Sequence, residues 1–463
     1  MDKLNLAARH RIEDELLATV GRTYRNETFW IVLLGLICVG GTLAWVVQLR
    51  DGLGVTGMRD YVSWGLYISL LFFFVGVSLI GAFVSCVLRL SDAKWRYPLI
   101  RIAEATTLSA IFFAGFMPVL DMGRPERLYF LLTHGRLQSP ILWDVAAIAT
   151  YLVGSVLFFY LPLIPDLAIM RDRLTHVAPW RRQLYRRLAL GWEGNYLQRR
   201  LLKKGLFILS IVILPVAVSV HTVSAWLIAF TLRPGWNSTI MGPYFVFGAL
   251  VAGTAILILI IALLRHGYRL EHYLTPVHFN NLAKILLALT VFYLYLNINK
   301  YGVPAFKMAK DEKALLEDLF YGRHAVLYWF TQVVGLVIPI ILLAFARVRH
   351  SINWVVAAAV MVLLGALTNR YLIVIPNLLH PFIPIQHAQP GFASYDPTLI
   401  EWTITAASLA GFVLLIILIF KPFPVITMWE ILEEVEEYGE KEIGVEGLII
   451  TETIEIVPSH ATL

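Results

Sequence analysis

The sequence predicts an all-α, polytopic membrane protein with about ten transmembrane helices, and three observations support this fold class. Hydrophobic residues make up 58% of the 463 residues, whereas charged residues make up only 15%. The mean hydropathy of +0.71 is too high for a soluble protein, because a core of this size cannot hide so much apolar surface from water. Apolar runs also recur at the length of about 20 residues that a helix needs to cross a hydrocarbon layer of roughly 30 Å.

Ten apolar runs follow one another along the chain and define the predicted spans. In order, they are Phe29–Leu49, Trp64–Leu88, Ala103–Leu120, Ile141–Leu163, Leu206–Phe230, Tyr244–Leu264, Val277–Ile298, Ala325–Ala346, Ile352–Ile375 and Trp402–Phe420. Most connections between them are short, so residues 29–420 are predicted to form one helical membrane domain.

Lysine and arginine residues are distributed unevenly between the two sides of this topology. With the N-terminus inside, the inner tails and loops hold roughly 25 of them and the outer loops roughly 12, which is the positive-inside bias. The inner loop Arg171–Lys204 is the most basic segment and is expected to set the topology and to contact lipid headgroups. The net charge of +6 therefore does not indicate nucleic-acid binding. An even number of spans places both termini in the cytoplasm.

The two tails differ in character. Residues 1–28 are charged and precede an apolar run too long for a signal peptide, so they are predicted to be a cytoplasmic N-terminal tail. Residues 421–463 are predicted to be an acidic cytoplasmic tail, in which Glu430–Glu455 carries ten Glu and one Lys. This stretch is either a solvated acidic face or a docking segment for a partner on the cytoplasmic side.

Polar residues gather at three span ends that the topology places together on the outer side. Span two begins there, span three ends there and span four begins there, and consecutive antiparallel spans usually pack as neighbours. The candidates for proton transfer are Asp121, His134 and Asp144, and the candidates for binding a planar headgroup are Trp64, Tyr67, Arg124, Arg127 and Ser139. Carboxylate, imidazole, guanidinium and aromatic groups suit a lipid-soluble ring with two oxygens. The structural alternative is interfacial anchoring, with the arginines paired to Asp121 and Glu126.

Three ionisable residues inside the spans are candidates for a proton path: His221, Glu104 and Lys284. An ionisable side chain is costly to bury in a membrane. A functional role is therefore the first hypothesis for such a residue. His221 lies in the middle of span five, whereas Glu104 and Lys284 lie nearer the inner ends of their spans. The alternatives are a neutral His221 hydrogen-bonded to a facing helix, and snorkelling of the other two side chains to the inner surface.

The sequence also limits the cofactors that this chain can hold. A membrane cytochrome b needs pairs of histidines within its spans as haem ligands, but His221 is the only deep histidine. Cys38 and Cys86 are isolated thiols and no CxxC run is present, so neither an Fe–S cluster nor a metal site is expected. No phosphate-binding loop motif occurs, so a nucleotide site is not expected either.

At the candidate residues the chain resembles the NrfD/PsrC family, the membrane subunits of polysulfide reductase. The matching pieces are Trp64-Gly-Leu-Tyr-Ile-Ser69, Asp121-Met-Gly-Arg-Pro125, Ser139-Pro-Ile-Leu-Trp-Asp144, Ser219-Val-His-Thr222, Arg233-Pro-Gly-Trp-Asn237 and Pro243-Tyr-Phe245. Their order and spacing match over about residues 61–375, which resembles the eight-span core of the family. Spans one and ten lie outside that core, and this ten-span form is similar to subunits of alternative complex III and to HybB- and DsrP-like subunits.

The resemblance implies two four-helix bundles, spans two to five and six to nine, with spans one and ten as peripheral helices. It implies a site for a quinone, expected to be menaquinone, in the first bundle near the outer face, and electron exchange with an Fe–S subunit bound there. It also implies that the complex contains other membrane subunits, among them a paralogue of this chain. The expected location is the bacterial cytoplasmic membrane, in contact with its lipid. One departure concerns a His that quinol-site subunits of alternative complex III carry in the span corresponding to Trp64–Leu88, where this chain has none.

Three functions remain open from the sequence. The leading one is a quinone-interacting membrane subunit of a quinol-linked respiratory oxidoreductase. The second is a structural or proton-translocating subunit without quinone turnover, which the missing His favours. The third is a secondary transporter, because Pro215 and His221 are compatible with a broken helix and a midplane site. Co-purification separates them, because a transporter purifies alone and a quinone subunit brings Fe–S proteins.

Overall fold

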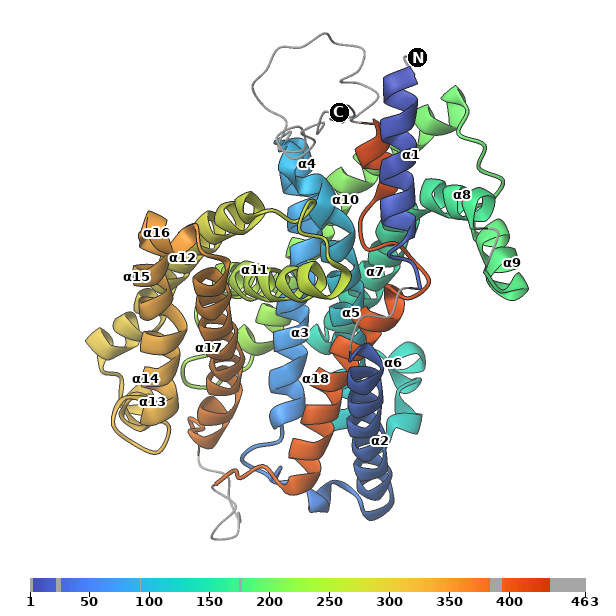
Figure 1. Cartoon of the computed structure of the whole chain (residues 1–463). Coiled ribbons are helices and arrows are strands. Elements are labelled where there is room, and N and C mark those ends of the chain that lie inside the picture. Colours follow the sequence, from blue (N-terminus) through green and yellow to red (C-terminus); the bar gives the residue numbers. More distant parts are fainter. Residues whose placement is uncertain (1–2, 22–25, 92, 175–176, 384–393, 434–463) are drawn as a thin grey trace.

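The computed structural model describes residues 3–21, 26–91, 93–174, 177–383 and 394–433. Within these ranges the chain forms helices joined by turns and loops, with no β-strand (Figure 1). Ten of the described helical segments are long and apolar enough to cross a membrane, which confirms the prediction of an all-α chain with ten spans.

The helical segments have the following bounds. The spans are α2 Glu27–Asp51; α3 Leu66–Ala82 with η2 Phe83–Val87 and α4 Leu88–Leu90; η3 Lys94–Arg96 with α5 Tyr97–Asp121; α7 Pro140–Tyr160; α10 Tyr196–Ala229; α11 Met241–Tyr268; α12 Pro276–Lys307; α14 Ala325–Trp329 with η5 Phe330–Val337 and α15 Ile338–Ala344; α17 Ile352–Leu379; and α18 Leu399–Ile419. The shorter elements are α1 Lys3–Leu17, η1 Leu53–Val55, η4 Pro125–Arg127, α6 Phe130–Thr133, α8 Leu163–Arg173, α9 Pro179–Leu188, α13 Lys310–Phe320 and α16 Ala346–Arg349.

Two spans extend well beyond their apolar runs. α10 begins at Tyr196 rather than at Leu206, because the Asn195 side chain caps its start by accepting a hydrogen bond from the Gln198 N–H at 2.9 Å. α12 continues to Lys307, and α13 follows almost at once. A hydropathy profile marks only the apolar part of a helix, so it misses turns that continue into the polar boundary.

α3 is the central helix of the membrane domain. All 17 of its residues are buried, because it packs against α5 and α10 and also against α11 and α17. Contacts run in a ring through α3, α5, α7 and α10, and in a second ring through α11, α12, η5 and α17. α2 and α18 pack against each other outside these rings, and a Cβ added at Gly41 would lie 2.1 Å from the Ala407 Cβ. Gly41 is therefore required for the close approach of these two helices.

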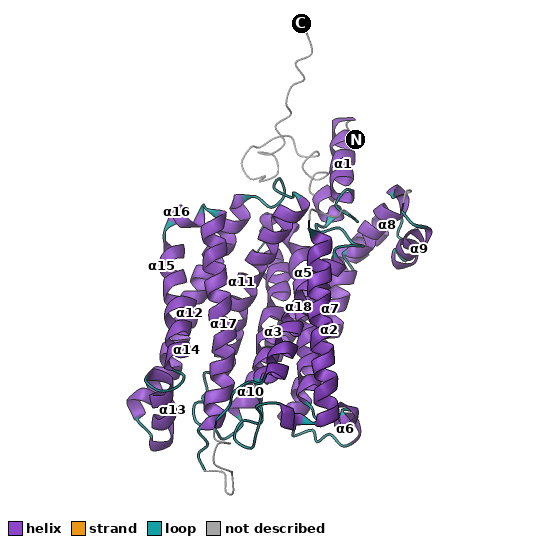
Figure 2. Cartoon of the chain, turned by 60° about the horizontal axis from the view of Figure 1, so that its bottom comes forward, coloured by secondary structure: helices purple, strands orange, loops and turns teal. Residues whose placement is uncertain are grey.

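The described ends of the chain lie at the same end of the bundle, called the terminal face below (Figure 2). α1 and the segment 421–433 are at the terminal face, whereas α6 and α13 are at the opposite, distal face. Asp166 accepts hydrogen bonds from the backbone N–H groups of Met428 at 3.1 Å and Trp429 at 2.9 Å. Glu430 pairs with Arg89 at 2.8 Å. The beginning of the acidic tail thus docks onto the membrane domain itself, and residues 434–463 lie outside the described chain.

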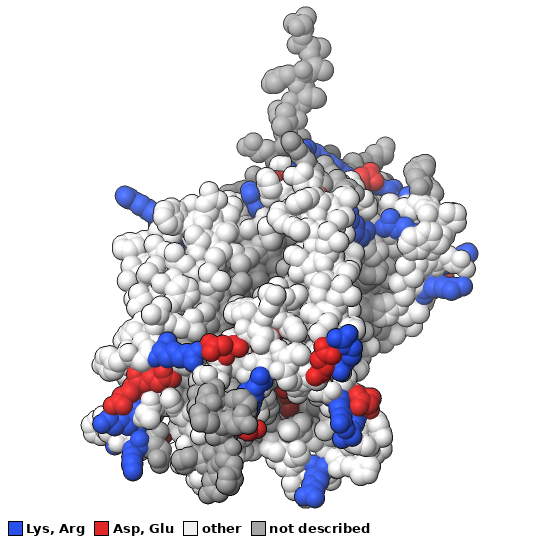
Figure 3. Space-filling model, turned by 90° about the horizontal axis from the view of Figure 1, so that it is seen from below, with Lys and Arg blue, Asp and Glu red and all other residues white. Residues whose placement is uncertain are grey.

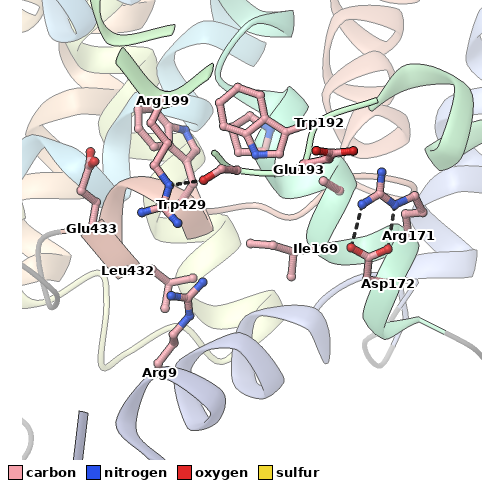
Figure 4. Close-up of a pocket in the computed structure, with 13 residues that line it drawn as sticks. Arg9, Ile169, Arg171, Asp172, Trp192, Glu193, Arg199, Trp429, Leu432 and Glu433 are labelled. Atoms are coloured by element: carbon pink, nitrogen blue, oxygen red, sulfur yellow. Dashed lines mark hydrogen bonds and ion pairs between the residues drawn. The ribbon is translucent and has the colours of Figure 1, made fainter. Parts of the chain in front are cut away.

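A pocket of about 220 Å³ lies beside this docked segment at the terminal face (Figure 4). Its basic side chains already have acceptors. Arg171 pairs with Asp172 at 2.7 Å, and Arg199 Nε donates to the Gly194 carbonyl at 2.9 Å. Trp429 also lines the pocket. Residues of the C-terminal segment thus form part of the wall of this pocket.

Candidate functional site

Asp121 lies at the distal end of α5, and one of its carboxylate oxygens, Oδ1, is buried with no hydrogen-bond partner. Tyr67 of α3 lies close enough to interact electrostatically with it and is fully buried. The Tyr67 hydroxyl donates to Gln48 Oε1 at 2.7 Å, and Gln48 Nε2 donates to the Leu120 carbonyl at 2.7 Å. Buried polar atoms in proteins almost always have partners, so the free Asp121 oxygen marks the strongest candidate for a ligand contact.

A second carboxylate, Glu401 of α18, lies near Asp121 and interacts with it electrostatically. Glu401 is fully buried and accepts hydrogen bonds from the Tyr395 hydroxyl at 2.6 Å and the Gly57 N–H at 2.6 Å. Burial, followed by the negative charge of Glu401, raises the pKa of Tyr395, so this hydroxyl keeps its proton. The Tyr395 oxygen also accepts from the Leu66 N–H at 3.0 Å, which ties the segment before α18 to the first turn of α3.

Three other predicted site residues lie at separate places. Trp64 stacks on the buried Trp236 with ring centroids 6.0 Å apart and planes inclined by 27°. Ser139 is partly buried at the N-cap of α7. Asp144 is buried on α7, where it accepts a hydrogen bond from the Ser224 hydroxyl of α10 at 2.5 Å. Asp144 therefore lies between two helices of the first ring.

The remaining predicted residues, Arg124, Arg127 and His134, are exposed on the distal face. The His134 ring shares a hydrogen bond with the hydroxyl of its neighbour Thr133 at 2.8 Å. Within the described chain, neither arginine forms an ion pair with Asp121. Acidic and basic side chains intermingle on the distal face seen from below (Figure 3). The structure thus brings Asp121 and Tyr67 together and leaves the other predicted contacts apart from them.

His221 is buried between α10 and α3, and its two ring nitrogens face two backbone carbonyls. Nδ1 lies 2.6 Å from the Ala217 oxygen, and Nε2 lies 2.8 Å from the Val75 oxygen. A neutral imidazole carries one N–H and can donate to only one of them, whereas an imidazolium donates to both. The site therefore offers two acceptors to a ring whose proton can sit on either nitrogen.

Polar groups continue from His221 along the inside of the first ring. The Ser78 hydroxyl shares the Val75 carbonyl with His221, donating at 2.7 Å. The Ser78 carbonyl accepts from the hydroxyls of Tyr151 at 2.7 Å and Thr107 at 2.8 Å. These hydroxyls lie on α7 and α5 and bridge three helices across the interior.

The predicted proton-path residues Glu104 and Lys284 have different surroundings. Glu104 is buried on α5, with Oε1 accepting from the Ser85 hydroxyl at 3.1 Å and Oε2 without a partner. Lys284 is exposed on α12, outside the first ring. Glu104 therefore belongs to the interior of the first ring, whereas Lys284 lies on the exposed side of α12.

The distal face also carries a carboxylate shared by two histidines. Asp318 Oδ2 lies 2.8 Å from His324 Nδ1 and 3.3 Å from His380 Nε2, beside an open hollow of about 640 Å³. Burial opposes ionisation of Asp318, but the hydrogen bonds and charge of His324, helped by His380, outweigh it and lower the pKa of Asp318. This hollow is open at the distal face, where a partner protein can reach it.

Gln48 and Glu401 are the important site residues that the sequence interpretation missed. Both belong to α2 and α18, the two spans that lie outside the eight-span core to which the family resemblance applies. Glu401 had a recognisable signal, because Thr398 and Glu401 form a capping box at the start of α18. Gln48 had a weaker sequence signal, because it is a single amide side chain near the end of an apolar run.

Comparison with known proteins places this arrangement in a family. The family model described as Polysulphide reductase, NrfD, matches residues 54–381. A putative membrane subunit of dimethyl sulfoxide reductase from Halobacterium salinarum is 27% identical, over 81% of this chain and 86% of the relative. A subunit of the selenate reductase of Mesobacillus selenatarsenatis is 22% identical, over 84% and 92%. The Hdr-like menaquinol oxidoreductase integral membrane subunit of Archaeoglobus fulgidus is 22% identical, over 88% and 95%. The family match covers well over half of a chain with ten membrane-spanning helices, and this multi-pass integral membrane protein belongs to the NrfD family.

Proposed function

We propose that this protein is the quinone-interacting membrane subunit of a respiratory oxidoreductase. The observation that carries the proposal is the buried, unpartnered Asp121 Oδ1 beside Tyr67 at the distal end of the bundle. The names of the relatives support it, because one is named as a menaquinol oxidoreductase subunit and two as subunits of reductases. Menaquinone is accordingly the expected quinone.

The donor and acceptor pattern at Asp121 fits the hydroxyl of a quinol. When bound, a quinol supplies two electrons and two protons to the complex. Asp121 offers a free oxygen to receive a hydrogen bond and then a proton. Glu401, the second buried carboxylate of the site, lies near enough to interact with Asp121 electrostatically.

The electrons require a carrier in a partner protein, which we assign to an Fe–S subunit on the distal face. In the proposed orientation the distal face is the outer one and both termini are cytoplasmic, as the lysine and arginine bias indicates. The hollow beside Asp318, together with the exposed segment 122–139, is the docking surface that we assign to this partner.

Proton conduction through the first ring is the second candidate function. It is favoured by three groups of buried polar side chains on the helices of the first ring: Asp144 with Ser224, His221 with Ser78, and Glu104 with Ser85. This role does not require quinone turnover in the same chain, so it also covers a paralogous subunit whose pocket has changed.

The deciding experiment is purification of the complex in mild detergent, followed by analysis of its lipid extract and its protein partners. We expect menaquinone in near-stoichiometric amount together with an Fe–S protein. An Fe–S partner without bound quinone would favour the proton-conducting or structural role. A chain that purifies alone would reject both and favour a transporter.

A further inference from the structure

The second ring of helices contains buried positive charge and no acidic residue on its own four spans. The four spans that form it, residues 241–268, 276–307, 325–344 and 352–379, include no Asp or Glu. Lys300 of α12 is only 6% exposed and Arg370 of α17 only 3%. Buried cations in proteins are normally paired, because removing an unpaired charge from water is strongly unfavourable.

Arg370 is the clearest example, within the described chain, of a buried positive charge without a partner. Its Nη1 is buried without a hydrogen-bond partner, and its guanidinium carbon lies 4.6 Å from the centre of the Phe245 ring. The side chain fits because of Gly248, where an added Cβ would lie 3.0 Å from Arg370 Nη2. Arginine stays protonated in proteins, so its charge cannot be removed by titration. Asn369, the preceding residue, also has a buried Nδ2 without a partner.

Lys300 faces a small cavity near the distal end of the same ring. Its Nζ lies 4.5 Å from the centre of the Tyr244 ring and 5.2 Å from that of Tyr301, and no ion pair to it is found in the described chain. The cavity has a volume of about 20 Å³, and Asn377 and Glu312 also line it. A cavity of roughly 10–15 Å³ already holds one water-sized particle.

The cavity is closed by the loop that carries the Arg233-Pro-Gly-Trp-Asn237 motif. Gly235 has a φ of +73°, and a Cβ there would lie 2.6 Å from Asn377 Nδ2 and 2.9 Å from the Leu315 side chain. Glycine is required at such a position because other residues rarely adopt this conformation. The loop and α13 are on the distal side, so a particle in the cavity would enter from the water on that side.

We propose that the cavity beside Lys300 binds a small inorganic anion of about the size of chloride. Arg370 is a second buried positive charge of the same ring. A water molecule in the cavity would accept a hydrogen bond from Lys300 but would leave its positive charge uncompensated, whereas an anion would accept the hydrogen bond and compensate the charge. The partly buried Glu312 also lines the cavity, and no ion pair between it and Lys300 is found in the described chain.

The test compares salts at equal ionic strength on the purified full-length protein. Thermal unfolding is followed in sodium gluconate, whose anion is too large for the cavity, while chloride or bromide replaces it stepwise. We expect a saturable rise of the unfolding midpoint with chloride and bromide. We also expect broadening of the ³⁵Cl NMR line by the protein, reversed by excess bromide.

Matched variants assign the effect to the cavity. Lys300→Gln should abolish the saturable response, whereas Lys307→Gln, an exposed lysine on the same helix, should keep it. Lys300→Arg retains the charge and should retain chloride binding if Lys300→Gln does not fold. Equal midpoints in chloride and gluconate for the unmodified protein, without ³⁵Cl broadening, would overturn the proposal. A saturable response that survives Lys300→Gln would overturn it as well.

Discussion

The Tyr67 hydroxyl donates its hydrogen bond to Gln48 Oε1, and the amide nitrogen of Gln48 donates to the Leu120 carbonyl, both at 2.7 Å. The two bonds together fix the orientation of the Gln48 side-chain amide, so the Tyr67 O–H points toward Gln48 Oε1. The Tyr67 oxygen is therefore left as an acceptor on its remaining side. With the free oxygen of Asp121, the site presents acceptors, which suit the hydroxyls of a quinol better than the carbonyls of a quinone.

Gln48→Leu should weaken quinol binding while the protein still assembles. The substitution frees the Tyr67 hydroxyl to turn and leaves a buried donor unsatisfied, at a cost of about 1–3 kcal/mol. We expect the KM for quinol to rise by roughly tenfold, the equivalent of about 1.4 kcal/mol, with a smaller change in kcat. Thr42→Ala, on the exposed side of the same helix, serves as the control. Equal KM values for Gln48→Leu and the control would contradict the role of Gln48.

Asp121→Asn should remove the proton acceptor and preserve its shape. Loss of a positioned general base typically costs about 10²–10⁴-fold, so quinol-dependent electron transfer should fall by that order. Arg124→Gln should have little effect, because Arg124 is exposed and unpaired with Asp121. Steady-state quinol oxidation by the assembled complex measures both. Normal turnover in Asp121→Asn would show that the quinol site lies elsewhere in this chain or in a paralogous subunit.

His221→Gln should slow proton uptake and leave the fold intact. Glutamine can donate to one of the two carbonyls that His221 faces, but its side chain cannot take up a proton. Proton transfer through this point should fall by about 10²-fold or more. The measurement is a pH-indicator assay in proteoliposomes, with Thr222→Ala, which changes the partly exposed next residue of α10, as the control. Unchanged proton uptake would establish a purely structural histidine.

Asp166→Ala should release the C-terminal segment and destabilise the protein. It breaks the fully buried pair with Arg101, whose loss typically costs about 3–5 kcal/mol, and removes the acceptor of the Met428 and Trp429 N–H groups. Limited proteolysis should then cut within residues 421–433. Asp172→Ala, which breaks an exposed pair with Arg171, should cost at most about 1 kcal/mol. Equal protease resistance of the two variants would argue against docking.

Labelling of introduced cysteines should show which face of the protein lies outside the cell. Arg187→Cys, on the basic α9 at the terminal face, should react with an impermeant maleimide only after cells are permeabilised. Leu132→Cys, which replaces a side chain that is 85% exposed at the distal face, should react in intact cells. The native Cys86 is buried and Cys38 lies within a span, so the background should be low. The reverse pattern would invert the topology and place the Fe–S partner on the cytoplasmic side.

The number of spans and the family were predictable because both depend on local sequence. A helix in lipid must satisfy its own backbone hydrogen bonds, so a run of apolar residues predicts a span without knowledge of its neighbours. Helix ends were less predictable. The cap at Asn195 and the continuation of α12 to Lys307 depend on polar residues that a hydropathy profile does not register.

The sequence by itself determined the ten spans, the acceptor character of Asp121 and the deep burial of His221. Only the tertiary structure decided which groups meet. Residues on one span end can point to any of several neighbouring helices, because a turn of 3.6 residues spreads side chains around the axis. Asp121 consequently lies near Tyr67 and Glu401, whereas His134 is exposed on the distal face. The rotation of each helix, and with it the site, is set by close packing such as that at Gly41, which involves residues far apart in the chain.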